Sequence, residues 1–162
     1  MAIRELRYRD DEILHKKCKE VIKFDDRLHI LLDDMYDTMK SKDGVGLAAP
    51  QVGILKRAAV IDISDVDEKR KKTKQPEIGK IELINPEIIE QEGEQTDNEG
   101  CLSFPDVFGK VTRPYKVTVK AQDRNGKWFK LTGEALLARA ICHEVEHLDG
   151  HVFTEKVTEY VE

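Results

Sequence analysis

The sequence predicts an α+β domain in which antiparallel β-sheets pack around a C-terminal helix bearing an H-E-x-x-H motif, with an amphipathic helix near the N-terminus. Two helical patterns flank a central series of strand-like runs. Strands that follow one another directly, without intervening helices, pair as antiparallel sheets. At 162 residues the chain has the length of one domain, so residues 1–162 are expected to form one unit, and 40% hydrophobic residues can supply its core.

The first helix is predicted over residues 24–40. Its apolar residues recur at helical spacing: Leu28, Leu32, Met35 and Met39. Asp25 or Asp26 can cap its start, because a short acidic side chain accepts hydrogen bonds from the first free backbone N–H groups. We interpret this segment as an amphipathic helix that covers a core and is broken by the glycine-containing stretch 43–46.

Strand signals occupy the middle of the chain. They cover residues 57–63, 80–84, 87–90, 115–122 and 128–131. Asn125-Gly126 lies between the last two runs and strongly indicates a hairpin. Residues 65–79 are charged and contain the basic run 69–72, for which a solvated loop is expected and a ribosome or nucleic-acid contact is the alternative.

The second helix is predicted over residues 133–150, with Gly150 as its C-terminal stop. It carries the sequence His143-Glu144-Val145-Glu146-His147. Histidines four residues apart lie one above the other on a helix, so His143 and His147 can both reach one metal ion. Glu144 is offset by about 100° and can lean over the metal's open position as a general base.

The two histidines continue an apolar stripe that includes Leu136 and Ala140, which directs them toward the interior. The alternative is a pair of surface histidines at the charged end of a helix.

A catalytic site of this kind usually needs a third protein ligand. A third histidine at position 153 would indicate a metzincin, but that residue is Phe153, so this class is excluded. Cys101 is the best candidate, because a thiolate is a strong ligand for divalent metals and Gly100 permits a turn that presents it. Cys18 and Cys142 are expected to be small buried apolar residues.

Composition narrows the classes of protein that fit. The formal net charge of −5 argues against a nucleic-acid binder, so no specific DNA partner is expected. No apolar run reaches the roughly 18 residues of a membrane span, and the charged N-terminus lacks a signal-peptide pattern. Three cysteines do not make a disulfide framework. A cytoplasmic protein without a membrane partner is expected.

Three short motifs occur in a characteristic order. They read GVGLAAPQ at 44–51, EGCLS at 99–103 and HEVEH at 143–147. Alone, the first would be read as a turn into a strand, but together the three resemble the motifs of peptide deformylases, over nearly the whole chain. Two departures are visible. Glu146 stands where that family usually has Asp, and the chain is short beyond Gly150.

The resemblance implies a metal site and a substrate. Cys101, His143 and His147 would hold one divalent metal ion, with water as a fourth ligand. Iron(II) is the expected metal, with nickel, cobalt or zinc able to take its place, because ligand identity alone does not select among them. The substrate would be the N-formyl-methionyl end of a nascent polypeptide, and formate would be released.

The resemblance also implies roles for further residues. Glu144 would carry protons, and the Gln51 side-chain amide and the Leu102 backbone N–H would stabilise the oxyanion. Gly46 would offer its backbone to an extended substrate. The methionine pocket would be lined by Val45, Leu136 and Ala140, for which ordinary core positions are the alternative.

Two other functions compete with this interpretation. An H-E-x-x-H endopeptidase would use a different third ligand and would not need Gln51 together with EGCLS. A non-catalytic metal-binding module would close the site with a fourth Cys or His at short spacing, and none is evident. A transient ribosome contact is an open possibility, and a monomer is expected.

Overall fold

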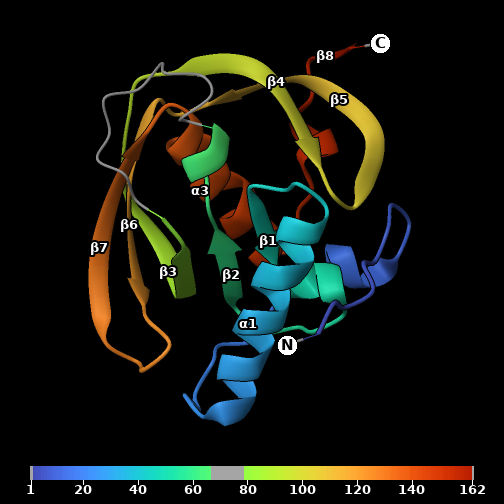
Figure 1. Cartoon of the computed structure of the whole chain (residues 1–162). Coiled ribbons are helices and arrows are strands. Elements are labelled where there is room, and N and C mark those ends of the chain that lie inside the picture. Colours follow the sequence, from blue (N-terminus) through green and yellow to red (C-terminus); the bar gives the residue numbers. More distant parts are fainter. Residues whose placement is uncertain (1, 67–78, 162) are drawn as a thin grey trace.

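The computed structural model describes residues 2–66 and 79–161. The described chain forms two antiparallel sheets, one with five strands in the order β1-β2-β3-β6-β7 and one with three in the order β4-β5-β8. Helix α3 contacts strands of both sheets, and helix α1 lies against β1 and β2 (Figure 1). The predicted α+β class, with antiparallel sheets around a C-terminal helix, is confirmed.

Helix α1, Asp26–Ser41, begins where the sequence predicts. The side chain of Asp25 is the N-cap and accepts a hydrogen bond from the Leu28 backbone N–H at 3.1 Å. Its buried face is lined by Leu28, Leu31, Leu32, Met35 and Met39. These side chains join β1 and β2 residues in one core cluster, so the interpretation as an amphipathic helix covering a core is confirmed.

The five-stranded sheet separates two cores. Its strands are β1 (Gly46–Ala48), β2 (Ala58–Ile61), β3 (Ile81–Glu92), β6 (Lys116–Gln122) and β7 (Trp128–Glu134). Every residue of β2 is buried, because Val60 packs in the core beneath α1 and Ile61 in the core beneath α3. The β6–β7 hairpin turns at Gly126, as predicted, with φ of 83°.

Strand β3 differs from the prediction of two separate strands. It runs through Asn85 and Pro86 with a shift of register between Ile84 and Glu87. Asn85 has a positive φ of 52°, and its side-chain amide exchanges two hydrogen bonds with the backbone of Val21, at 2.8 and 2.9 Å. This bulge is therefore held by a segment distant in the chain, which explains why local patterning read it as a break.

The strands of the second sheet lie in segments where no strand was predicted. They are β4 (Gln95–Cys101), β5 (Phe104–Arg113) and β8 (Glu159–Val161). The β4–β5 turn lies at Leu102 and Ser103, after Cys101, so the expectation that Gly100 permits a turn that presents the thiol is wrong, although the strand pairing shifts register between Glu99 and Cys101. Gly100 lies inside β4, and a Cβ there would stand 2.7 Å from the ring of Phe108. The glycine therefore makes room for an aromatic side chain on the neighbouring strand.

Helix α3, Leu136–Leu148, starts later than predicted because residues 133–134 belong to β7. It ends at Leu148, and Gly150, two residues further on, stops it as predicted with φ of 84°. Short 3-10 helices complete the described chain: η1 (Glu12–His15), η2 (Ala49–Val52) and η3 (Phe153–Lys156). The apolar face of α3 packs on β2, β3 and β6, and the histidines continue that face.

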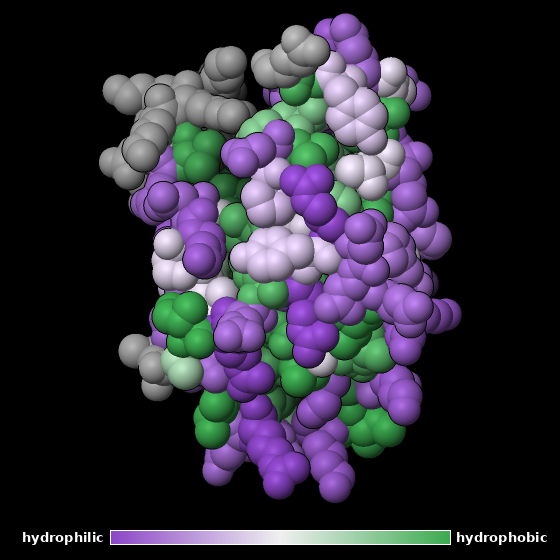
Figure 2. All heavy atoms as spheres, turned by 90° about the vertical axis from the view of Figure 1, so that its right-hand side faces the viewer, coloured by the Kyte–Doolittle hydropathy of each residue, from purple (hydrophilic) through white to green (hydrophobic). Residues whose placement is uncertain are grey.

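The surface is mixed in character. One face shows hydrophobic side chains between hydrophilic ones (Figure 2), as expected when a small chain has too little polar surface to cover itself. No helix in the described part of the chain has the length and apolar character needed to cross a membrane. The basic run 69–72, with its alternative of a ribosome contact, lies outside the described residues.

Candidate active site

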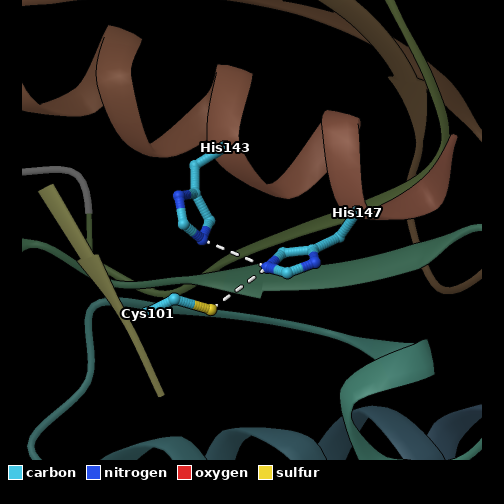
Figure 3. A group of neighbouring side chains, drawn as sticks. All are labelled: Cys101, His143 and His147. Atoms are coloured by element: carbon cyan, nitrogen blue, oxygen red, sulfur yellow. Dashed lines mark hydrogen bonds between the residues drawn. The ribbon is translucent and has the colours of Figure 1, made fainter. Parts of the chain in front are cut away.

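Three potential metal-binding side chains meet where α3 faces the end of β4 (Figure 3). His143 and His147 are one turn apart on α3, and Cys101 is the last residue of β4. Nε2 of His147 lies 3.1 Å from Nε2 of His143 and 3.3 Å from Sγ of Cys101. The structure thus brings together the three residues that the motifs indicate, with all donor atoms within 4.8 Å of one another.

The donor set fits a divalent metal ion. A tetrahedral ion with metal–nitrogen bonds of about 2.05 Å would separate two ligand nitrogens by about 3.3 Å, close to the observed spacing of the histidines. The rings of His143 and His147 are 8% and 1% exposed, and burial lowers the pKa of His147 well below its usual value. A neutral imidazole is the form that binds metals.

Glu99 determines the orientation of the His143 ring. Nδ1 of His143 donates to Oε2 of Glu99 at 2.7 Å, which leaves the Nε2 lone pair directed at the cluster. Two buried guanidinium groups, of Arg113 and Arg139, also donate to Glu99. Burial alone would raise the pKa of Glu99, but the hydrogen bonds from His143 and Arg113 hold it well below its usual value. Glu99 is therefore a carboxylate that accepts from every partner.

Glu144 lies beside the three donors without being one of them. Its side chain is buried, and burial raises its pKa to about 7. Among the described residues its Oε1 has no hydrogen-bond partner. A Cβ at Gly46 would collide with the Glu144 carboxylate, so the glycine provides the space in which this carboxylate sits. Gly46 therefore has a second reason to be glycine besides any contact with a substrate.

Gln51 approaches the cluster from η2. Its Oε1 accepts from the backbone N–H of Ala48 at 2.9 Å, which fixes the amide and directs Nε2 toward β4. Nε2 lies 3.4 Å from Sγ of Cys101 and 3.0 Å from Oγ of Ser103. Gln51 and Ser103 are 1% and 0% exposed. Both ends of the amide are thus held in place beside Cys101.

A cavity of about 700 Å³ opens beside the donors. Its walls include Val45, Gly46, Cys101, Leu102, Leu136, Ala140, His143 and Glu144. Gln51 and His147 lie behind this wall. The cavity is therefore apolar on the side of Val45 and Leu136 and polar at His143 and Glu144, a combination typical of ligand-binding sites.

Several residues of the site have no sequence signal strong enough to be singled out. In the sequence Arg113, Arg139 and Ser103 look like ordinary polar residues, and Glu99 stands out only as the first residue of the EGCLS motif. A charged residue at 139 within an otherwise apolar helical face was the one available hint, because a buried arginine needs a partner.

The fold and the site define a class of protein. An H-E-x-x-H helix, a cysteine donor and a buried carboxylate next to an apolar cavity are the parts of a metallohydrolase.

The comparisons with known proteins agree and are more specific. The sequence profile of the polypeptide deformylase family matches residues 3–161. The chain belongs to this family.

Individual relatives cover almost the whole chain. A peptide deformylase of Caldicellulosiruptor bescii is 57% identical over 99% of this chain and 89% of its own length. Peptide deformylase 1 of Bacillus subtilis is 51% identical over 99% of this chain and 93% of its own length. Among solved structures, the Thermotoga maritima peptide deformylase has a TM-score of 0.86 at 36% identity, covering 96% of this chain and 98% of that one.

The family fixes the class of reaction. Its members are metal-dependent hydrolases that remove N-terminal formyl groups from newly made polypeptides. A similar structure, from Synechococcus elongatus, is a peptide deformylase in complex with actinonin, with a TM-score of 0.83, 41% identity and coverage of 95% of this chain and 78% of that one.

Proposed function

We propose that this chain removes the formyl group from the N-terminal formyl-methionine of newly synthesised polypeptides and releases formate. The observation that carries the proposal is the convergence of Cys101, His143 and His147 beside the buried carboxylate of Glu144. An H-E-x-x-H endopeptidase would draw its third ligand from elsewhere, and a structural metal site would not adjoin a cavity of this size.

Cys101, His143 and His147 are the proposed ligands of one divalent metal ion, with iron(II) as the expected metal and nickel, cobalt or zinc able to substitute. When bound, the ion would supply Lewis-acid activation of water and of the formyl oxygen near neutral pH. One thiolate and two imidazoles do not select among these metals. Metal analysis of protein prepared without air is therefore the measurement that identifies it.

Glu144 is the proposed carrier of the proton. Its carboxylate accepts a proton from the attacking water and returns one to the nitrogen of the departing amine. The contacts support this role, because Oε1 is buried and makes no hydrogen bond within residues 2–66 and 79–161, so its capacity to accept one is left for a reactant. The collision that a Cβ at Gly46 would cause also indicates that the carboxylate occupies a defined position.

Gln51 and Leu102 are the proposed donors to the oxyanion that forms as the formyl carbon is attacked. Nε2 of Gln51 already faces Cys101, and the backbone of Leu102 follows Cys101 directly and lines the cavity. Donors held in place before the reaction stabilise developing charge without the cost of reorienting. The amide of Gln51 is held through its Oε1, which supports this role.

The substrate backbone is proposed to pair with Gly46. This residue begins β1, one of the two edge strands of the five-stranded sheet, and an extended peptide can add to such an edge. The methionine side chain is proposed to enter the cavity between Val45, Leu136 and Ala140, all of which line it. The pairing would place the formyl group next to Glu144, because a Cβ at Gly46 would contact that residue.

The wider setting is also proposed. Residues from β1, η2, β4 and α3 build the site, which supports one catalytic domain over residues 1–162. We expect the protein to act as a cytoplasmic monomer that meets the nascent chain, with no DNA or membrane partner. A transient contact to the ribosome is an additional hypothesis.

The deciding assay follows formate release from formyl-Met-Ala-Ser in parallel with cleavage of internal bonds in unblocked peptides. Stoichiometric formate with intact peptide bonds is the expected result. Cleavage between internal residues, without formate, would indicate the endopeptidase instead.

A further inference from the structure

We propose that Glu146 is a positioning residue that couples the C-terminal segment to the metal ligand His143. Glu146 precedes His147 on α3 and is itself not among the three converging donors. The inference rests on the proposed role of His143 as a ligand. It concerns a chain of charged side chains running from Lys156 through Glu146, Arg113 and Glu99 to the imidazole.

The outer half of this chain is a carboxylate shared by two cations. Oε1 of Glu146 lies 2.6 Å from Nη1 of Arg113, and Oε2 lies 2.5 Å from Nζ of Lys156. The side chain of Arg113 is 2% exposed, that of Glu146 18% and that of Lys156 55%. Each oxygen of Glu146 thus has its own partner, one buried and one at the surface.

The inner half of the chain, from Arg113 to His143, explains why Arg113 needs Glu146 as a partner. Glu99 accepts from both Arg113 and Arg139 and also from Nδ1 of His143. With Glu99 alone, one carboxylate would face two buried guanidinium groups. Glu146 supplies a second negative charge to Arg113, so Glu99 is not drawn away from the imidazole.

The C-terminal segment also packs against the imidazole ring of His143. Phe153 of η3 is buried, and its ring centroid lies 6.0 Å from that of His143. Further along, the Val157 side chain packs over Gly109 of β5, where a Cβ would collide with it. The ion pair between Glu146 and Lys156, at the end of η3, therefore anchors the segment whose Phe153 packs beside the His143 ring.

The length of the side chain matters. A glutamate reaches both Arg113 and Lys156, whereas an aspartate at the same helical position is one methylene shorter and would have to give up or lengthen one of the two pairs. Glu146→Asp therefore keeps the negative charge but shortens the side chain, whereas Glu146→Gln removes the charge and keeps the size.

The test uses the full-length protein loaded with cobalt(II), whose affinity and visible absorption spectrum report on the ligand geometry. Groups that orient a metal-bound histidine typically contribute about 10–100-fold in metal affinity. We expect Glu146→Gln to lose affinity within this range and to change the spectrum. We expect Glu146→Asp to lose a measurable amount that stays below about tenfold, because it keeps the charge but lengthens one of the two pairs.

A second readout uses the metal-free protein. The Nδ1 proton of His143, held in a 2.7 Å hydrogen bond to Glu99, should exchange slowly with water in the wild type and faster in Glu146→Gln. Lys110→Met is the matched control. It breaks a 3.3 Å ion pair with Glu159, which lies on the same terminal segment, but this ion pair is not connected to His143.

The outcomes separate the possibilities. If Glu146→Gln has the same cobalt affinity, spectrum and proton exchange as the wild type, the coupling is overturned. This holds even if the variant unfolds at a lower temperature, because Glu146 would then only stabilise the fold. If Glu146→Gln does not fold, a Glu146→Asp variant with unchanged affinity and exchange would overturn it. A wild-type protein that binds no cobalt would refute the ligand assignment, and the coupling with it.

Discussion

Glu144 combines three properties at one position. It is buried, it adjoins the cluster of Cys101, His143 and His147, and it sits against a residue without a side chain, Gly46. Burial opposes its negative charge, which is why its pKa is raised to about 7. Its neighbours on α3 are committed to other contacts, since His143 bonds to Glu99 and Glu146 to Arg113. Glu144 is therefore the carboxylate of this helix left available to the substrate side.

Replacing Glu144 by Gln should preserve metal binding and remove most of the turnover. The amide has the size of the acid but cannot accept a proton, and general acid–base groups contribute about 10²–10⁴-fold. Metal content and kcat for formate release, measured on the same preparation, check both halves. Near-normal turnover would exclude Glu144 as the proton carrier.

Cys101→Ala should lose the metal, because no other thiol lies in the donor group. Cys18→Ala is the matched control and should retain one equivalent. Cys18 is a buried apolar residue in the core, as predicted, and burial raises the pKa of its thiol to about 11, so it stays protonated and unreactive at neutral pH. Metal analysis after dialysis measures both variants, and an unchanged metal equivalent in Cys101→Ala would show that the ligand set is different.

At the scale of single elements, the end of α3 is determined by one glycine. Gly150 adopts φ of 84°, and the N–H groups of Gly150 and His151 bond back to the carbonyls of His147 and Glu146 at 3.1 and 2.9 Å. These bonds satisfy carbonyls that the last helical turn would otherwise leave without partners. The turn also directs the chain into η3, so α3 and the C-terminal segment meet at this residue.

Gly150→Ala should lower the free energy of unfolding by more than about 1 kcal/mol. A side chain is strained at this positive φ, and its Cβ would lie 2.9 Å from the His15 carbonyl oxygen and the Lys16 carbonyl carbon, which are backbone atoms that cannot rotate away. Gly79→Ala is the control, since a Cβ there meets nothing within 4 Å. Urea denaturation of both variants gives the comparison, and equal stabilities would contradict the strain argument.

At the scale of the whole molecule, the site exists only where both sheets meet α3. Cys101 comes from the three-stranded sheet, Gly46 from the five-stranded sheet and the histidines from the helix between them. The space around the reacting carbon is therefore bounded on several sides by elements that are packed against one another. Such a space tolerates added bulk poorly.

This closure predicts selectivity for the acyl group. A formyl carbon carries only hydrogen, and an added methyl in a packed site commonly costs about 1–3 kcal/mol, or roughly ten- to a hundredfold in kcat/KM. Formyl-Met peptides should be processed well, and acetyl-Met peptides hardly at all. Formyl-Gly peptides should be poor substrates, because they leave the apolar cavity at Val45 and Leu136 unfilled. Comparable kcat/KM for formyl-Met and acetyl-Met peptides would contradict the deformylase assignment.

The sequence by itself determined the features that depend on near neighbours in the chain. Helix α1 and its Asp25 cap, the β6–β7 hairpin and the end of α3 at Gly150 follow from periodicity and turn chemistry within a few residues. The shared direction of His143 and His147 follows from their spacing of four on a helix. The three motifs were recognisable for the same reason, because each is a short local arrangement.

Tertiary structure decided the features that join distant segments. Glu99 and His143 are 44 positions apart, and Asn85 holds a bulge through Val21, which is 64 positions away. The polar β4 strand forms because β5 pairs with it, and Gly46 must be glycine because Glu144 of another element lies against it. Whether a buried charge has a partner depends on packing, not on its neighbours in sequence, and for that reason the network around Glu99 and Glu146 becomes visible only in the folded chain.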